Sequence, residues 1–164
     1  MAQEWQTVGG TSPRAIEQRL CDAAEGGGDS LRTRLRLALA ELLRLVEQEP
    51  GVARELLAGS QGGGEEAALR REETMERLLA RLQETTARWP PSGPPPSPLA
   101  AAAVIGGVER VLQTRLREAG PGRLRELLPS LVYIAALHME GPGAAREAQA
   151  ECEAGAVGRE DIRG

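Results

Sequence analysis

The chain has 164 residues, of which 41% are hydrophobic and 27% charged, which is ordinary for a soluble globular protein of one domain. Its formal net charge is −4, and no stretch gathers arginine without glutamate, so we expect this chain not to bind nucleic acid. Aromatic residues make up only 2%, with no Phe, so the core must consist of Leu, Ala and Val, which favours packed helices and predicts an all-α fold.

Residues 1–29 are expected to form an N-terminal extension with one weak helix. Ser12 and Pro13 can begin this helix, because a serine caps the first turn and a proline fits the first helical position. Its apolar face is narrow, and the triplet Gly26-Gly27-Gly28 ends it. The glycines are typical of a linker.

The clearest helix of the sequence follows, capped by Asp29 or Ser30. Its apolar residues recur at helical spacing along one face: Leu31, Leu35, Ala38, Leu39, Leu42 and Val46. Pro50 ends this helix and begins a short one over residues 51–59.

A long helix is predicted from Glu65 to about Arg88. Glu72 falls on its apolar face, between Ala68 and Met75. Two interpretations of Glu72 stay open: an ion pair with a neighbouring arginine at the edge of the stripe, or a polar contact inside a ligand cavity. The proline-rich segment 89–98 then forms a loop.

The next predicted helix, residues 99–116, contains the adjacent pair Gly106 and Gly107. Each glycine costs a helix about 1 kcal/mol relative to Ala, so a close approach of another backbone is expected to offset the loss. A final helix is predicted from about residue 122 to His138, kinked at Pro129 and apolar nearly all round in its second half.

These two helices carry more apolar surface than one core uses, which predicts a homodimer with a four-helix interface. The alternative is a tight crossing of helices within one chain. The predicted interface residues are Ala103, Gly106, Gly107 and Arg110 from the first helix, and Leu128, Val132, Tyr133 and Ala136 from the second.

Three segments, taken in order, resemble a known domain. They are LRLALAELLRLVEQEPGVARELLAGSQGGGEEAALRRE (35–72), AAAVIGGVERVLQTRL (101–116) and LRELLPSLVYIAALHMEGPGAA (124–145). Their EP-x-x-AR, GG and ELLP-x-LVY patterns resemble the C-terminal regulatory domain of TetR-family transcription regulators. The resemblance implies a dimer interface on the last two long helices and an effector cavity enclosed by the preceding ones. It places the regulatory domain at 30–142 and leaves 143–164 as a flexible or weakly helical tail.

The resemblance does not extend to the family's DNA-binding part. Three helices with their turns need about 45 residues, whereas residues 1–29 hold one weak helix and no basic recognition helix. Two explanations stay open: a fragment or misplaced gene start, or a stand-alone domain that forms inactive heterodimers.

The cavity implied by the resemblance is expected at inward positions of three helices. Either Trp89 or Tyr133 would supply its aromatic surface, and the alternative is that these positions are plain core. The predicted ligand-binding residues are Leu39, Leu42, Leu43, Glu72, Met75, Leu79, Leu82 and Val108.

Catalytic chemistry is not indicated. The chain has one His, and no phosphate-binding glycine motif follows a strand, so we expect no metal, no cofactor and no enzyme. No apolar stretch is long enough for a membrane and no signal peptide is visible, which predicts a cytoplasmic protein. Together these features predict an all-α bundle of about five to six helices that binds a small apolar effector and dimerises. The alternative is a helical protein-interaction module with no small-molecule ligand.

Overall fold

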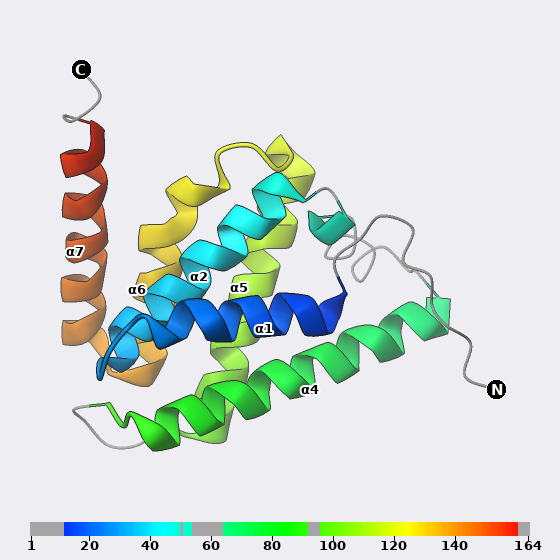
Figure 1. Cartoon of the computed structure of the whole chain (residues 1–164), viewed down its shortest axis with the longest axis horizontal. Coiled ribbons are helices and arrows are strands. Elements are labelled where there is room, and N and C mark those ends of the chain that lie inside the picture. The colour runs from blue at the N-terminus through cyan, green and yellow to red at the C-terminus, as the bar shows by residue number, and fades with distance from the viewer. Residues whose placement is uncertain (1–11, 50, 54–63, 92–95, 161–164) are drawn as a thin grey trace.

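The computed structural model describes residues 12–49, 51–53, 64–91 and 96–160. Every regular element in these ranges is helical, which confirms the all-α prediction (Figure 1). The short helix predicted over 51–59 is helical at residues 51–53, and the rest of it lies outside the described ranges. The elements are α1 (Pro13–Glu25), α2 (Leu31–Gln48), α4 (Gly64–Arg88), α5 (Pro98–Ala119), the 3-10 helix η1 (Leu124–Leu127), α6 (Leu128–Met139) and α7 (Pro142–Glu160).

Three of these helices begin at a serine. The hydroxyl of Ser12 accepts a hydrogen bond from the backbone N–H of Ala15, Ser30 accepts one from Thr33, and Ser97 accepts one from Ala100. Each bond satisfies one of the N–H groups that the first turn of a helix leaves without a partner. The sequence left Asp29 and Ser30 open as the cap of α2, and the structure shows that the cap is Ser30.

The core lies where α2, α5 and α6 pack together. Leucine and valine dominate it, as the composition predicts, and in the described ranges no aromatic side chain is among its fully buried residues. The largest fully buried side chains are Leu43, Leu45, Val46, Leu112, Leu124 and Leu131.

The turn between α1 and α2 is tighter than a linker. A Cβ added at Gly27 would lie 2.7 Å from the backbone nitrogen of Arg34 and 2.6 Å from its Cγ, closer than real Cβ atoms come. Gly28 has a φ of +59°, a left-handed conformation that glycine adopts without strain. The glycines at 27 and 28 therefore let α2 fold back closely against the end of α1.

Pro129 does not kink a long final helix, contrary to the prediction. The segment divides into η1 and α6, and Pro129 falls in the first turn of α6, where its missing N–H removes no helical hydrogen bond. Arg123 precedes η1 with a φ of +62°. Glu47 of α2 holds η1 in place, because its carboxylate accepts from the Arg125 backbone N–H at 2.9 Å and pairs with the Arg125 Nε at 3.0 Å.

The segment after Gly141 is a helix, α7, that packs against α6, as Figure 1 shows at its left edge. Ala145 and Ala148 are buried, so the described part of the segment expected to be a flexible or weakly helical tail is helical and packs on the rest of the fold. Arg32 of α2 pairs with Glu147 of α7 at 3.5 Å and with Glu140, at the end of α6, at 2.9 Å. The helices α5 and α6, at 98–119 and 128–139, are therefore followed by a further helix, α7, that belongs to the same fold.

Gly106 and Gly107 are not sites of close approach within the described part of the chain. A Cβ added at Gly106 would meet nothing within 4 Å, and one at Gly107 would meet only Ile134 Cγ2, at an ordinary 3.8 Å. The sequence left two explanations of this glycine pair open, and one of them was a tight crossing of helices within one chain. That crossing is not found among the described residues.

Candidate ligand-binding cavity

A cavity of about 480 Å³ lies between α1, α2, α4 and α5 and is partly open to solvent. In Figure 1, α4 runs below α1 and α5 crosses behind it, so the cavity is bounded by helices far apart in the sequence. Most of its lining is aliphatic. The apolar side chains come from α1 (Ile16, Leu20, Ala24), α2 (Leu35, Ala38, Leu39, Leu42), α4 (Met75, Leu78, Leu82), α5 (Val104, Ile105, Val108, Leu112), Val52 and Ala135.

Five of the eight predicted ligand-binding residues line this cavity, namely Leu39, Leu42, Met75, Leu82 and Val108. The other three lie elsewhere. Leu43 is fully buried in the core, and Leu79 packs against that core beside the cavity.

Glu72 is exposed and does not line the cavity. It lies toward the N-terminal end of α4, whereas the residues of α4 that line the cavity begin at Thr74. Helical spacing places Glu72 on the apolar face, but the cavity does not extend to its level.

Arg34 of α2 is the buried cation of this site. Its side chain lines the cavity, and the residue is only 7% exposed. Nη1 donates to the backbone carbonyl of Ala24 at 3.1 Å, near the C-terminal end of α1, while Nε is buried with no hydrogen-bond partner. No ion pair or further hydrogen bond of Arg34 is found within the described residues.

Trp89, directly after α4, supplies the aromatic surface of the cavity, and Tyr133 does not line it. The Arg34 guanidinium carbon lies 3.5 Å from the centre of the Trp89 ring, and that of Arg88 lies 4.6 Å from it. Both distances fall within the range of cation–π contacts. The Trp89 ring therefore contacts the same cation that lines the cavity.

Two of the acidic side chains at the cavity, Glu17 and Glu109, have partners of their own. Glu17 of α1 pairs with Arg81 of α4 at 2.9 Å, and so joins two of the helices that line the cavity. Glu109 of α5 is buried and accepts from Gln113 Nε2 at 3.0 Å. These carboxylates are therefore held by neighbouring groups.

Cys21 of α1 also lines the cavity and is half-buried. Burial raises the pKa of its thiol above the ordinary value, and the charge of Arg81 opposes the shift in part. The side chain is therefore a neutral thiol at neutral pH and adds to the apolar character of the wall.

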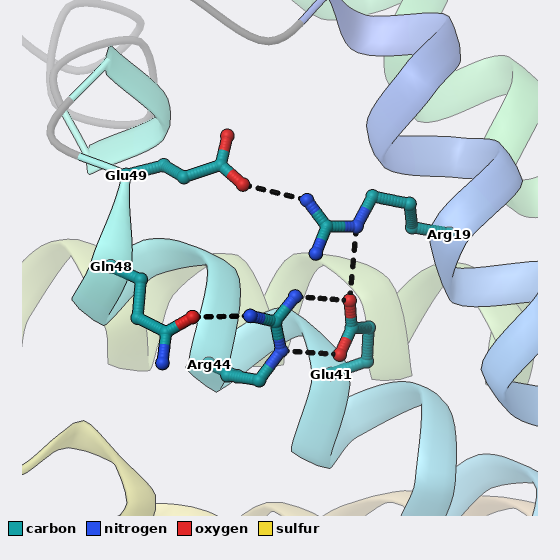
Figure 2. Close-up of polar contacts among 5 residues, drawn as sticks. All are labelled: Arg19, Glu41, Arg44, Gln48 and Glu49. Carbon is teal, nitrogen blue, oxygen red and sulfur yellow. Dashed lines mark hydrogen bonds and ion pairs between the residues drawn. The ribbon is translucent and has the colours of Figure 1, made fainter.

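A polar network holds α1, one wall of the cavity, against α2 (Figure 2). Arg19 of α1 donates from Nε to Glu41 at 3.1 Å and from Nη1 to Glu49 at 2.7 Å. Arg44 donates two hydrogen bonds of 2.7 Å to the same Glu41 carboxylate and also donates to Gln48. One arginine of α1 thus meets two carboxylates, Glu41, which Arg44 also holds, and Glu49, which directly follows α2.

The contributions of α1 and of Arg34 were missed by sequence reasoning. The apolar face of α1 is short, so this helix looked like an extension outside the regulatory domain. Arg34, however, lies three residues after Leu31 and four before Ala38, which places it within the apolar stripe of α2. An arginine at such a position is the signal that could have identified it.

The predicted interface residues divide into three groups. Ala103, Gly106 and Arg110 are exposed on α5, whereas Gly107, Leu128 and Tyr133 are half-buried. Val132 and Ala136 are buried within the chain by its own helices, so a partner could not reach them in this fold.

In the described ranges, no cluster of three or more His, Cys, Asp or Glu side chains is arranged to hold a metal ion. None of the helices described is both long and apolar enough to cross a membrane. Comparison of the chain with models of protein families, with curated proteins and with solved structures finds no match.

Proposed function

We propose that the chain binds a small apolar effector and dimerises, as the regulatory module of a TetR-like transcription regulator. The observation that carries the proposal is the cavity between α1, α2, α4 and α5. Its volume of about 480 Å³ falls within the range of about 300–1,000 Å³ that is usual for small-molecule sites. A mostly aliphatic wall with a few polar groups is the usual chemistry of such sites, and no catalytic step is assigned to it.

The open side of Gly106 supports dimerisation. Its neighbours on this face of α5 are the small side chains Ala102 and Ala103, which are exposed, and Leu99, which is 80% exposed. Since nothing in the described chain approaches Gly106, we propose that α5 of a second copy packs there, beside the half-buried Tyr133 of α6. Small residues let two helix axes come closer than the usual 8–10 Å.

Binding of a neutral apolar fluorophore, N-phenylnaphthylamine, tests the cavity. We expect the wild-type chain to bind it, and Met75→Trp, which fills the cavity, to weaken binding by about tenfold. Glu72→Trp adds the same ring at an exposed position of α4 that does not line the cavity, three residues away, and should leave binding unchanged. A wild-type chain that does not bind the probe would favour the protein-interaction module instead.

Light scattering tests the dimer. The wild-type chain should be a dimer at micromolar concentration, and Gly106→Leu should be a folded monomer, because leucine has room in the single chain but holds two α5 helices apart. Gly143→Leu places leucine at another open helical glycine, on α7, and should leave the dimer intact. A monomeric wild type, or a Gly106→Leu chain that dimerises unchanged, contradicts the proposed interface.

A further inference from the structure

The state of Arg34 indicates the chemical class of the ligand. A buried guanidinium has five N–H donors, and its charge is costly to remove from water unless it is paired. Within the described chain, one hydrogen bond to the Ala24 carbonyl is found, and the partial negative charge at the end of α1 offsets the charge only in part. The Trp89 ring lies against the guanidinium, with its centre 3.5 Å from the guanidinium carbon.

The unused edge of the guanidinium is the one that binds carboxylates best. Nη1 is occupied by Ala24, so Nε and Nη2 remain, and these two donors lie side by side in the plane of the group. A carboxylate accepts from such a pair through both oxygens, and the charge-assisted bonds are stronger than neutral ones. Arg34 is itself among the residues that line the mostly aliphatic cavity.

We propose that the ligand is an aliphatic compound with a single carboxylate, which pairs with Arg34 while its hydrocarbon part fills the cavity. This inference rests on the proposed function. A single charge is favoured because four carboxylates (Glu17, Glu25, Glu84 and Glu109) line the cavity against three guanidinium groups (Arg34, Arg81 and Arg88), so a dianionic phosphate would be repelled more strongly than a carboxylate. The buried guanidinium of Arg34 would thus be paired with the one carboxylate of the ligand.

Competition with bound N-phenylnaphthylamine tests the pairing, with decanoate, decanol and decyl phosphate each used below its micellar concentration. We expect the wild-type chain to bind decanoate at least about tenfold more tightly than decanol, and more tightly than decyl phosphate. Arg34→Gln should lose the preference for decanoate and keep its affinity for decanol and the neutral probe. Arg36→Gln is the matched control, because Arg36 is on the same helix and does not line the cavity, and it should keep the preference.

Arg34→Lys guards against an Arg34→Gln chain that does not fold, since it keeps the charge and loses the paired donors. Its preference for decanoate should be reduced but not abolished. Equal binding of decanoate and decanol by the wild type, stronger binding of decyl phosphate, or an undiminished preference in an Arg34 variant would overturn the inference. In each of these cases the neutral probe still binds, whereas failure of the proposed function would abolish probe binding itself.

Discussion

The guanidinium of Arg34 stacks on the indole ring of Trp89, with its central carbon 3.5 Å from the ring centre. This contact joins α2 to the segment that directly follows α4. Arg34 and Trp89 are 55 positions apart in the sequence. Their contact therefore brings two distant segments together at the cavity wall. The stacked pair therefore contributes to the fold as well as to the lining of the cavity.

Replacing Trp89 by leucine should lower the free energy of unfolding by about 1–2 kcal/mol, because the cation–π contact and part of the buried ring surface are lost. Urea denaturation followed by far-UV circular dichroism measures the change. Trp89→Phe keeps an aromatic face beneath Arg34 and should recover about half of the loss. Equal stability of the Leu and Phe variants would show that stacking contributes nothing.

Gly27→Ala should destabilise the fold by about 2–3 kcal/mol, because the new Cβ would overlap the backbone of Arg34. The adjacent Gly26→Ala is the matched control. Its Cβ would lie 3.4 Å from the Ala23 carbonyl oxygen and 3.6 Å from Leu37, so the change should stay within about 0.5 kcal/mol. Thermal unfolding of both variants distinguishes them, and similar melting temperatures would contradict the tight turn.

The Arg19–Glu49 pair should have a coupling energy of about 0.5–1 kcal/mol in a double-mutant cycle of Arg19→Gln and Glu49→Gln. The value is modest because the two side chains are 38% and 28% exposed, so water and salt screen the pair. Urea denaturation at low and high salt measures it, and the coupling should fall as salt increases. A coupling energy of zero at low salt would mean that the contact in Figure 2 does not hold α1.

Cys21 should react with iodoacetamide more slowly than a free thiol at neutral pH. Burial raises the pKa of this thiol, which leaves less of the reactive thiolate at a given pH. The rate should therefore rise by about tenfold per pH unit up to the raised pKa. Mass spectrometry of the labelled chain follows the reaction.

Binding of N-phenylnaphthylamine should protect Cys21 and leave Cys152 unprotected. Burial raises the pKa of both thiols, but only Cys21 is among the residues that line the cavity. Cys152 thus serves as an internal reference in the same sample. Equal protection of both cysteines would place the probe outside the cavity.

Local signals in the sequence predicted the individual helices well. The apolar stripe from Leu31 to Val46 gives α2, and Ser97 with Pro98 gives the start of α5, because caps and helical periods depend on neighbours a few residues away. Pro129 was misplaced for a related reason: a proline inside an apolar run can either kink one helix or begin the next, and only the packing of η1 on α2 decides between them.

The cavity was predicted only in part. The helical spacing of apolar residues identifies which face of a helix is buried, but it does not identify the element that covers this face. Met75 and Leu82 were correctly placed on an inward face of their helix. The position of α1 on the opposite side of the cavity was not predictable, because it depends on how tightly the Gly26-Gly27-Gly28 turn folds back. The packing of α7 was likewise invisible, since small alanines such as Ala145 bury well without forming a strong apolar stripe.

Open space beside Gly106 and its absence beside Gly27 place these two glycines in different genetic classes. Every missense change at codon 27 introduces a Cβ into the backbone of Arg34, so a saturation scan should find all of them defective, whatever their size or charge. At codon 106, the single chain accommodates a side chain, and loss of function should instead be graded by the volume of the new residue. Second-site suppressors would follow the same division, arising in a partner surface for position 106 and nowhere for position 27.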